Sequence, residues 1–452
     1  DNVINNLSPF EVQFQENRPF FTEGTEIFNK AGLFYSRRVG ATPRGYFSVQ
    51  GMENDSMRIT RNPGIVQLLN ATKFSGRARK KLGIGIFNAV AAPTYAELEN
   101  INSKTTERIL TEPLTNYSVV VLDQALKGRS SVTLTNTNVT RNGAGRDANV
   151  TGLDFALFDK QNLFGVRGKL DYSYVRTKNP YSGFRTFINA GKVSGKVQYS
   201  ITNNIESDRY DPNDLGILQA PNEVTTVGAI SYNQLTPTDK FNSFSYSFSV
   251  RNEMLYKPFR YANTRFNARG FWFFKNFWDV SVNLSLQPWW QNDFFDLRTP
   301  GRFLKKVPFG FVSVEGSSDS RKRLFGRWGF GFAESVDIEG DPFYFLRGGL
   351  RYRFSDRLSL DMNLNRTADR GQFGFAFQRE ANGDPVIGRR NNTEFTTLIN
   401  GIYNFTSRMN LTLRARHYWS RVRYVAFFNV KEDGFWTNRS FIEGQDLSLI
   451  HI

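Results

Sequence analysis

The sequence is poor in the residues that most enzyme and metal sites use. It has no cysteine and only two histidines among 452 residues. The absence of cysteine excludes a disulfide scaffold and thiolate metal sites. No apolar run reaches about 18 residues, which excludes a transmembrane helix. The chain opens on Asp1 without an initiator methionine or an apolar signal region, so we expect a fragment of a longer protein.

Common catalytic motifs are also missing. There is no Walker loop, HExxH zinc motif or GxSxG elbow. His417 falls on the apolar side of an alternating segment, and His451 lies in the stretch Asp446–Ile452, to which we assign no role. Glu380 and Asp384 form a lone acidic pair in a predicted loop, which is weak evidence for glycosidase chemistry. We expect no enzymatic activity, no catalytic residue, no cofactor and no metal.

Positive charge is in excess, with 58 Lys and Arg against 42 Asp and Glu. Basic clusters occur at residues 77–81 and 321–323, both in predicted short connections. The sequence has no basic helix and no recognisable nucleic-acid module, so nucleic acid is not an expected partner. Solvated turns, or contacts with phospholipid head groups, account better for these clusters.

Alternation with a period of two residues recurs along the chain after about residue 60. From Val280 the sequence reads Val-Ser-Val-Asn-Leu-Ser-Leu-Gln, which predicts a strand with one oily face and one wet face. The pattern recurs in residues 193–201, 243–250 and 358–365. Roughly 18 strands are predicted. They begin near residues 65, 82, 116, 130, 149, 163, 184, 193, 222, 241, 260, 277, 306, 323, 343, 357, 393 and 409.

The connections between these segments alternate in length. Short connections are predicted at residues 236–239, 275–276, 355–357 and 406–408, and long ones at 92–113, 206–221, 288–305 and 367–392. Short turns on one rim and long loops on the other are typical of bacterial outer-membrane barrels. The predicted fold is therefore all-β, a large antiparallel transmembrane β-barrel. Residues 63–452 would form the incomplete barrel and residues 1–62 an irregular periplasmic or plug-like segment.

A soluble sandwich, propeller or multidomain β protein is the alternative, because these also have short alternating strands. Three features weigh against it. Many strands are about 9–13 residues long, which fits a tilted bilayer span better than the roughly 5–6 residues of soluble strands. Their polar faces are too hydrophilic for a packed interior. Aromatic residues gather at strand ends, where an interfacial girdle would place Trp272, Trp278, Trp289, Trp290 and Trp419.

Basic residues fall on the polar faces of the predicted strands. An arginine on the lipid face near mid-bilayer costs about 2–4 kcal/mol, so these side chains should point into the lumen. A surplus of arginine there would favour anions in a pore. Alternatively, the arginines pair with Asp and Glu of the N-terminal segment and of inward loops. The predicted lumen-facing residues are Arg167, Lys169, Arg251, Arg327, Arg347, Arg351, Arg353, Arg414 and Arg416.

Strand parity bears on the ends of the barrel. The strand from Met409 should run outward, and residues 429–434 resemble the start of an outer loop with no return strand after it. Single-chain outer-membrane barrels have an even strand number, so we expect at least one closing strand to be missing. On the N-terminal side, Tyr46–Gln50 is a candidate for the first outward strand.

Residues 1–62 lack sustained alternation and contain two distinctive stretches, Ser8–Phe21 and Leu33–Gly40. These stretches resemble the start of the barrel region in a family of Bacteroidota proteins, the domain of unknown function 5916. In that family the region commonly follows an N-terminal carbohydrate-binding domain of the family 9 type. The resemblance implies an outer-membrane location and points to a link with glycans, and it supplies no known activity.

The physical interpretation of these stretches is a segment at the periplasmic mouth or a partial plug in the lumen. An ordinary linker with aromatic anchors is the alternative. In a plug, the charged residues would pair with charges of the lumen. The motif residues are Glu11, Glu16, Arg18, Phe20, Phe21, Tyr35, Arg37 and Arg38.

Two function classes follow. The first is a passive or gated conduit in the bacterial outer membrane, for oligosaccharides or other anionic solutes. The second is a plugged structural or assembly barrel that anchors a periplasmic carbohydrate-binding domain or a partner protein. Outer-membrane lipid is an expected partner of both. A TonB-box-like extension would favour active uptake, and none is recognisable in the sequence.

Overall fold

The computed structural model describes residues 7–30, 32–143, 145–335, 342–378 and 383–439, and within them the fold is all-β, as predicted. Helical structure is limited to two short α-helices, α1 (Pro19–Thr22) and α2 (Tyr46–Gln50), and one 3-10 turn at Ser36–Arg38. No helix within these ranges has the length and apolar character needed to cross a membrane. Residues 440–452, which include His451, lie outside the described residues.

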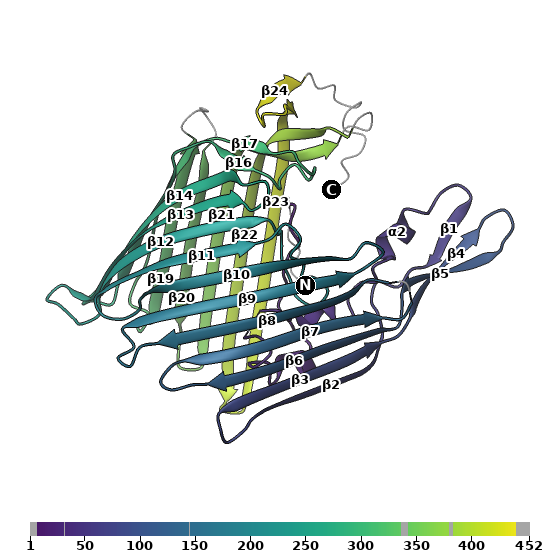
Figure 1. Ribbon diagram of the computed structural model, residues 1–452. Coiled ribbons are helices and arrows are strands. Elements are labelled where there is room, and N and C mark those ends of the chain that lie inside the picture. The colour runs from purple at the N-terminus through teal and green to yellow at the C-terminus, as the bar shows by residue number, and fades with distance from the viewer. Residues whose placement is uncertain (1–6, 31, 144, 336–341, 379–382, 440–452) are drawn as a thin grey trace.

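Nineteen strands form one antiparallel sheet in which neighbours in the sheet follow one another along the chain (Figure 1). In order they are β2 (Leu68–Arg77), β3 (Leu82–Ala91), β6 (Thr115–Ala125), β7 (Ser131–Arg141), β8 (Asp147–Phe158), β9 (Phe164–Arg176), β10 (Tyr181–Lys192), β11 (Val197–Glu206), β12 (Glu223–Gln234), β13 (Phe241–Leu255), β14 (Arg260–Phe274), β15 (Asp279–Gln287), β18 (Phe309–Ser317), β19 (Leu324–Ser335), β20 (Phe343–Arg353), β21 (Leu358–Gln378), β22 (Pro385–Thr406), β23 (Met409–Val430) and β24 (Trp436–Arg439).

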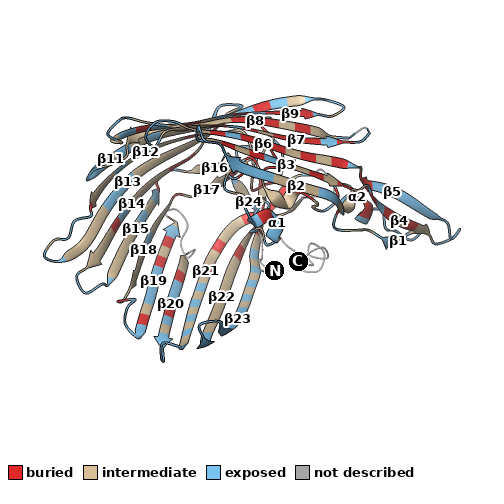
Figure 2. Cartoon of the chain, turned by 90° about the horizontal axis from the view of Figure 1, so that it is seen from below, coloured by how far each residue is buried: buried red, intermediate tan, exposed pale blue. Residues whose placement is uncertain are grey.

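The sheet is strongly curved, but its two ends do not pair with each other. Strand β2 pairs with β3, and β24 pairs with β23 over Phe427–Val430. Among the described residues no pairing joins β2 to β23 or β24, so the sheet is not closed into a barrel. Figure 2 shows the sheet curling around helix α1, with β2 and β23 near its two margins. The predicted large antiparallel sheet is confirmed in this open form.

Seventeen of the 18 predicted strand starts lie within four residues of an observed start, and the start near 393 is wrong because β22 begins at Pro385. Five strands begin at the predicted residue, namely Leu82, Phe241, Arg260, Phe343 and Met409. Alternation locates these strands well because each has one apolar face and short polar turns at its ends.

The prediction of a long loop at residues 367–392 is wrong. Strand β21 continues to Gln378, and β22 starts at Pro385. The glycines of this stretch suggested a loop, but at least one of them lies in a strand where a neighbouring aromatic ring needs the space. A Cβ at Gly388 would lie 2.3 Å from Cε1 of Tyr424. The expected absence of a return strand after residue 434 is also wrong, because β24 is a short one.

The connections divide the sheet into two rims. One, the short-turn rim, carries the turns at residues 78–81, 126–130, 159–163, 193–196, 235–240, 275–278, 318–323, 354–357 and 407–408. The other, the long-loop rim, carries the long connections, some of which contain strands. Strands β1 (Met57–Arg61), β4 (Thr94–Asn100) and β5 (Thr106–Glu112) form a separate sheet, and β16 (Gln291–Asp293) and β17 (Leu304–Lys306) form a hairpin.

The two faces of the large sheet differ in composition. On β9, Leu170, Tyr172 and Tyr174 are exposed on the face that we name the outer face. Asp171 and Ser173 are buried on the opposite, inner face. The inner face is the one that the N-terminal residues cover. The alternation of the sequence is thus an alternation between an apolar outer face and a polar inner face.

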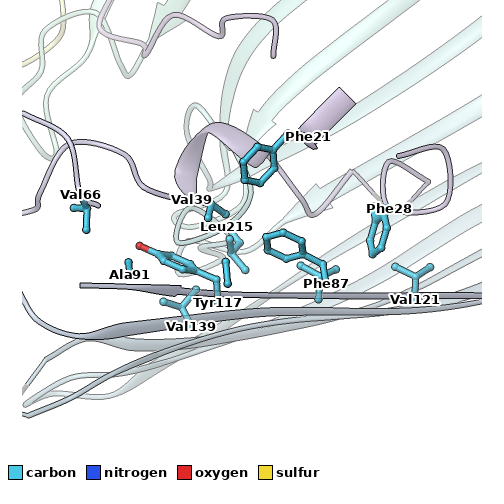
Figure 3. Packing of buried hydrophobic residues seen from close by; sticks show 12 residues of the cluster. Phe21, Phe28, Val39, Val66, Phe87, Ala91, Tyr117, Val121, Val139 and Leu215 are labelled. Atoms are coloured by element: carbon cyan, nitrogen blue, oxygen red, sulfur yellow. The ribbon is translucent and has the colours of Figure 1, made fainter. Parts of the chain in front are cut away.

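The largest hydrophobic core lies between the inner face and residues 7–50, which we name the N-terminal segment. Phe21, Phe28 and Val39 of this segment belong to the core (Figure 3). Their partners are Phe87, Ala89 and Ala91 of β3, Tyr117, Val119 and Val121 of β6, Val139 of β7, Leu215 of the β11–β12 connection, and Val66. Burial of one such phenylalanine contributes about 1.5–3 kcal/mol, so packing holds the segment on the sheet.

Tyr46–Gln50 is a helix and not the strand that the sequence suggested. Its Val49 packs against Ala96 and Leu98 of β4. The backbone N–H of Gly45 donates to the carbonyl oxygen of Thr111 on β5 (2.9 Å). The small sheet of β1, β4 and β5 supplies these contacts. The residues of β4 and β5 were expected to form a loop, and those of β1 to belong to the irregular N-terminal segment.

Candidate functional site on the inner face of the sheet

Two glycines of β3 allow the N-terminal segment to lie directly on the sheet. A Cβ at Gly83 would be 2.9 Å from Cδ1 of Ile27, and one at Gly85 would be 2.8 Å from Cγ2 of the same residue. Next to them Phe28 is 1% exposed, and its ring centre lies 6.2 Å from that of Phe34. A Cβ at Gly85 would also lie 3.1 Å from the Phe28 ring, so a larger side chain at this position would displace the segment.

Asp123 of β6 connects the segment to the sheet electrostatically. Its side chain is 1% exposed and forms ion pairs with Lys30 of the segment (2.6 Å) and Arg77 of β2 (3.0 Å). The hydroxyl of Thr133 on β7 also donates to it (2.8 Å). A buried carboxylate with two cationic partners is strongly destabilising when those partners are removed, because its charge is then left uncompensated.

Glu16 organises the charged part of the segment. Its carboxylate accepts hydrogen bonds from Arg18 (2.8 Å) and from the hydroxyl of Ser36 (2.6 Å). Burial alone would raise the pKa of Glu16, but these hydrogen bonds outweigh it and lower the pKa to about 2. The Arg18 guanidinium also donates to the Val39 carbonyl (3.0 Å) and lies 4.1 Å from the ring centre of Phe21.

The remaining charged motif residues also find partners close by. Arg38 pairs with Glu11 (2.6 Å) and donates to the carbonyl of Gly216 (3.2 Å), and Arg37 donates to the carbonyl of Gln15 (2.8 Å). The expectation that the charged residues of the motif pair with charges of the lumen wall is wrong. Opposite charges are brought together when the two stretches of the segment fold against each other.

The aromatic motif residues fix the backbone of the segment. The Tyr35 hydroxyl accepts a hydrogen bond from the N–H of Phe14 (3.0 Å) and lies 3.1 Å from the carbonyl of the same residue. Phe20 packs edge-on against Phe21 (5.1 Å between ring centres) and lies below the ammonium of Lys73 on β2 (4.9 Å). The motif residues thus stabilise the N-terminal segment through contacts with one another, and the segment as a whole packs on the sheet.

The nine predicted lumen-facing basic residues lie on the inner face by the register of their strands. Four of them pair with carboxylates of the same or neighbouring strands: Lys169 with Asp154 (3.1 Å), Arg251 with Glu223 (3.6 Å), Arg327 with Asp361 (2.8 Å) and Arg347 with Glu315 (3.3 Å). The expectation that the arginines pair with acidic residues of the N-terminal segment is wrong for these residues. Each acidic partner belongs to a strand.

The other five basic residues have different surroundings. Arg351 and Arg353 donate to the carbonyl of Ser320 in the short-turn rim, and Arg167 lies 5.7 Å from the ring centre of Phe158. Arg414 and Arg416 are exposed and alternate with leucines of the outer face. Even paired arginines stay accessible, because the side chains of Arg327 and Arg347 are 42% and 52% exposed.

A cavity of about 690 Å³ lies on the inner side near the long-loop rim. The N-terminal segment closes one side of it, where Phe10 lies 5.9 Å from Phe295 and Arg298 donates to the carbonyl of Ser8 (3.3 Å). The charged residues that line it are Glu253, Arg265, Asp293, Asp296, Lys305, Lys306, Asp369, Arg370 and Arg390.

Lys306 is the best-satisfied cation of this cavity. It pairs with Asp293 (2.6 Å) and Asp296 (3.1 Å). Burial lowers the pKa of Lys306, but the two carboxylates raise it by more, so the ammonium stays charged. This cluster was not predicted, because residues 288–305 were expected to form a loop. The available signal was two aspartates three positions apart, followed by the Lys305-Lys306 pair.

The five predicted girdle tryptophans fall into two groups. Trp272 and Trp289 contact outer-face residues, since the Trp272 indole donates to the Tyr246 hydroxyl (3.1 Å) and Trp289 packs against Phe266 (5.9 Å). Trp278 in a short turn is 47% exposed, and Trp419 on β23 is 45% exposed. Trp290 lies elsewhere, because it packs against Phe435 and Trp436 of the long-loop rim (5.2 and 6.1 Å).

The described ranges offer little for metal or acid–base chemistry. No group of three or more His, Cys, Asp and Glu within them is arranged to hold a metal ion. His417 is exposed on the outer face and contacts the ring of Phe395 (6.4 Å). Of the acidic pair noted in the sequence, Asp384 forms an ion pair with Arg302 (3.3 Å), and Glu380 lies outside the described residues.

Comparison with known families gives one result. Residues 1–448 match the model of a family described as domain of unknown function (DUF5916). No curated protein matches the chain. The match covers nearly the whole sequence, including both stretches of the N-terminal segment that carry the resemblance.

Proposed function

This chain belongs to the DUF5916 family, and we propose that it is a bacterial outer-membrane protein that acts as a gated conduit for anionic solutes. In this proposal residues 63–452 form the wall of a transmembrane barrel and residues 1–62 a plug-like segment. Closure is part of the proposal, because the free backbone groups of the edge strands β2 and β23 must be paired inside a bilayer.

The outer face supports a membrane location. Large apolar side chains are exposed along it, such as Tyr172 (53%), Leu284 (50%), Leu350 (58%) and Leu413 (62%). In water such a continuous apolar surface would be an aggregation liability, whereas in a bilayer it is the expected wall. Short turns on one rim and long loops on the other agree with this placement.

The main support for a conduit is a set of solvent-accessible arginines on the inner face. Arg327, Arg347, Arg414 and Arg416 line strands β19–β23 and remain exposed although two of them have acidic partners. Rings of basic side chains select for anions in a pore. The proposed cargo is therefore small anionic solutes, including acidic oligosaccharides. The proposal involves no catalysis and no nucleic acid.

Single-channel conductance in planar bilayers tests the conduit, with the reversal potential measured under a KCl gradient. We expect anion-selective current that rises when residues 7–50 are deleted. Persistent silence of both proteins, after their insertion and folding have been demonstrated, would contradict the conduit.

A second candidate function is a plugged barrel that anchors a periplasmic domain or partner protein. The size of the hydrophobic core between the N-terminal segment and strands β3, β6 and β7 favours it, because twelve buried residues hold the segment in place. The same recordings distinguish the two functions. An anchor stays silent with the segment intact and conducts only after the segment has been deleted.

A further inference from the structure

Three arginines lie close together on the outer face of strands β21 and β23. The register places Arg366 of β21, Phe395 of β22 and Trp419 of β23 in one row across three strands. Arg421 and Arg423 follow on β23 toward the long-loop rim, on the same face as Trp419. All three arginines are exposed. We name them the outer arginine cluster.

The cluster begins where the apolar part of the outer face ends. Between the short-turn rim and Trp419 the outward side chains of β23 include Leu411 and Leu413, which are 59% and 62% exposed. Strand β23 needs about 11 residues from Met409 to reach Trp419, and a tilted strand crosses the hydrocarbon core in about 9–11 residues. Trp419 therefore falls at the interface, where tryptophan is favoured, and Arg366 lies level with it. Arg421 and Arg423 lie further toward the long-loop rim, at head-group depth.

The cluster has no acidic partner in the part of the chain that the structure describes. No carboxylate there lies within ion-pair distance of Arg366, Arg421 or Arg423, in contrast to the inward Arg327 and Arg347. Glu394 is next to Phe395 in β22 and therefore faces inward. The only ring contact of the three is that of Arg366 with Tyr344 (6.0 Å), among the described residues.

These side chains border a shallow depression of about 600 Å³. Its floor and sides contain Thr393, Phe395, His417 and Trp419, so a basic edge lies beside an aromatic surface. Arg370 borders it as well. A ligand that fits this arrangement has an anionic end toward the long-loop rim and an apolar end toward the leucines of the outer face.

We propose that the outer arginine cluster binds the phosphate group of an anionic membrane lipid. This rests on the proposed membrane location, since the outer face must contact a bilayer. Guanidinium groups bind phosphate oxygens in a bidentate manner, and three of them are available without a competing carboxylate. The aromatic surface and the leucines would contact the acyl chains, which a free phosphate ion in water lacks.

Quenching of Trp419 by brominated lipids tests this inference. The full chain is inserted into phosphatidylcholine vesicles in which about one lipid in ten is brominated. The brominated lipid is either phosphatidic acid, which is a simple phosphomonoester lipid, or phosphatidylcholine. The Trp419 signal is the difference between the protein and its Trp419→Phe variant. The test variant is Arg421→Gln/Arg423→Gln. The matched control is Arg414→Gln/Arg416→Gln, which removes the same charge from the inner face of the same strand.

We expect phosphatidic acid to quench Trp419 more strongly than phosphatidylcholine does. Its association constant should fall by about fivefold for each arginine removed in the test variant and stay unchanged in the control. Excess inorganic phosphate in the buffer should displace it only weakly. Three results would overturn the inference: the test variant keeps the preference for phosphatidic acid, the control loses as much affinity for phosphatidic acid as the test variant, or inorganic phosphate displaces phosphatidic acid completely.

Failure of the membrane proposal would look different. In that case neither brominated lipid quenches any outer-face tryptophan, and the lipid site falls with the proposal. Quenching by brominated phosphatidylcholine without a preference for phosphatidic acid would remove the lipid site alone.

Discussion

Replacing Phe28 by alanine should release the N-terminal segment from the inner face while the sheet stays folded. Phe28 is 1% exposed and lies in the core that the segment shares with β3 and β6. A buried Phe→Ala substitution costs about 3–5 kcal/mol. Because each 1.4 kcal/mol is about tenfold in an equilibrium constant, docking should weaken by roughly two to four orders of magnitude.

Hydrogen exchange of the protein in lipid nanodiscs measures this effect locally. Amides of residues 20–40 should exchange faster by about the same factor, whereas those of strands far from the segment, such as β14, should keep their protection. Phe14→Ala is the matched control, since Phe14 belongs to the same segment but is 42% exposed. A surface substitution of this kind changes stability by about 0.5 kcal/mol or less.

Protection of residues 20–40 that changes less than about threefold in Phe28→Ala would refute the reasoning, because the hydrophobic core would then not be what holds the segment. Equal deprotection in the Phe14→Ala control would also contradict it. Uniform loss of protection across the sheet would instead mean that segment and sheet unfold as one unit.

Four further outcomes are expected. Gly85→Val should displace the segment as Phe28→Ala does, since a Cβ there would lie 2.8 Å from Ile27, and proteolysis of the segment by trypsin reports it. Asp123→Ala should lower the stability of the folded protein by about 1–3 kcal/mol, because its hydrogen bonds are lost while Lys30 and Arg77, which are 37% and 50% exposed, can be rehydrated, and unfolding in urea measures this. The pKa of Glu16 is lowered from 4.5 to about 2, so its carboxylate stabilises the segment fully above pH 4.5 and this contribution is lost as the pH falls through about 2. Proteolysis of the segment by pepsin should therefore accelerate as the pH is lowered over that range, and the acceleration should be smaller in the Glu16→Gln variant than in the unmodified protein. Arg347→Glu should move the reversal potential away from anion selectivity, and an unchanged potential would exclude this residue from the conducting path.

Much of the sheet was predictable because its strands are half-buried in a simple way. Alternation in residues 280–287 or 358–365 depends only on which face a side chain occupies, and that information is local in the sequence. The inward direction of Arg327 and Arg347 followed from the same alternation. Strand starts and the difference between the rims could therefore be derived from single segments.

The parts that could not be predicted depend on contacts between distant residues. The acidic partners of the inner arginines, such as Asp361 for Arg327, are fixed by which strands are neighbours and in what register. The helix at residues 46–50 depends on a small sheet formed by β1, β4 and β5. Gly374 and Gly388 lie in strands, where the side chains of Arg390 and Tyr424 occupy the space next to them. Local patterns contain none of this information.

The position of the N-terminal segment has a consequence for the order of folding. Arg298 donates to the carbonyl of Ser8, a contact between residues 290 positions apart, and Arg38 donates to Gly216, 178 positions away. Contacts of such long range form slowly, because the entropy of closing the intervening chain must be overcome first. The N-terminal segment is thus among the last parts of the chain to reach its native position. During folding the inner face of the sheet would stay exposed to solvent until the later strands have formed and the N-terminal segment can dock.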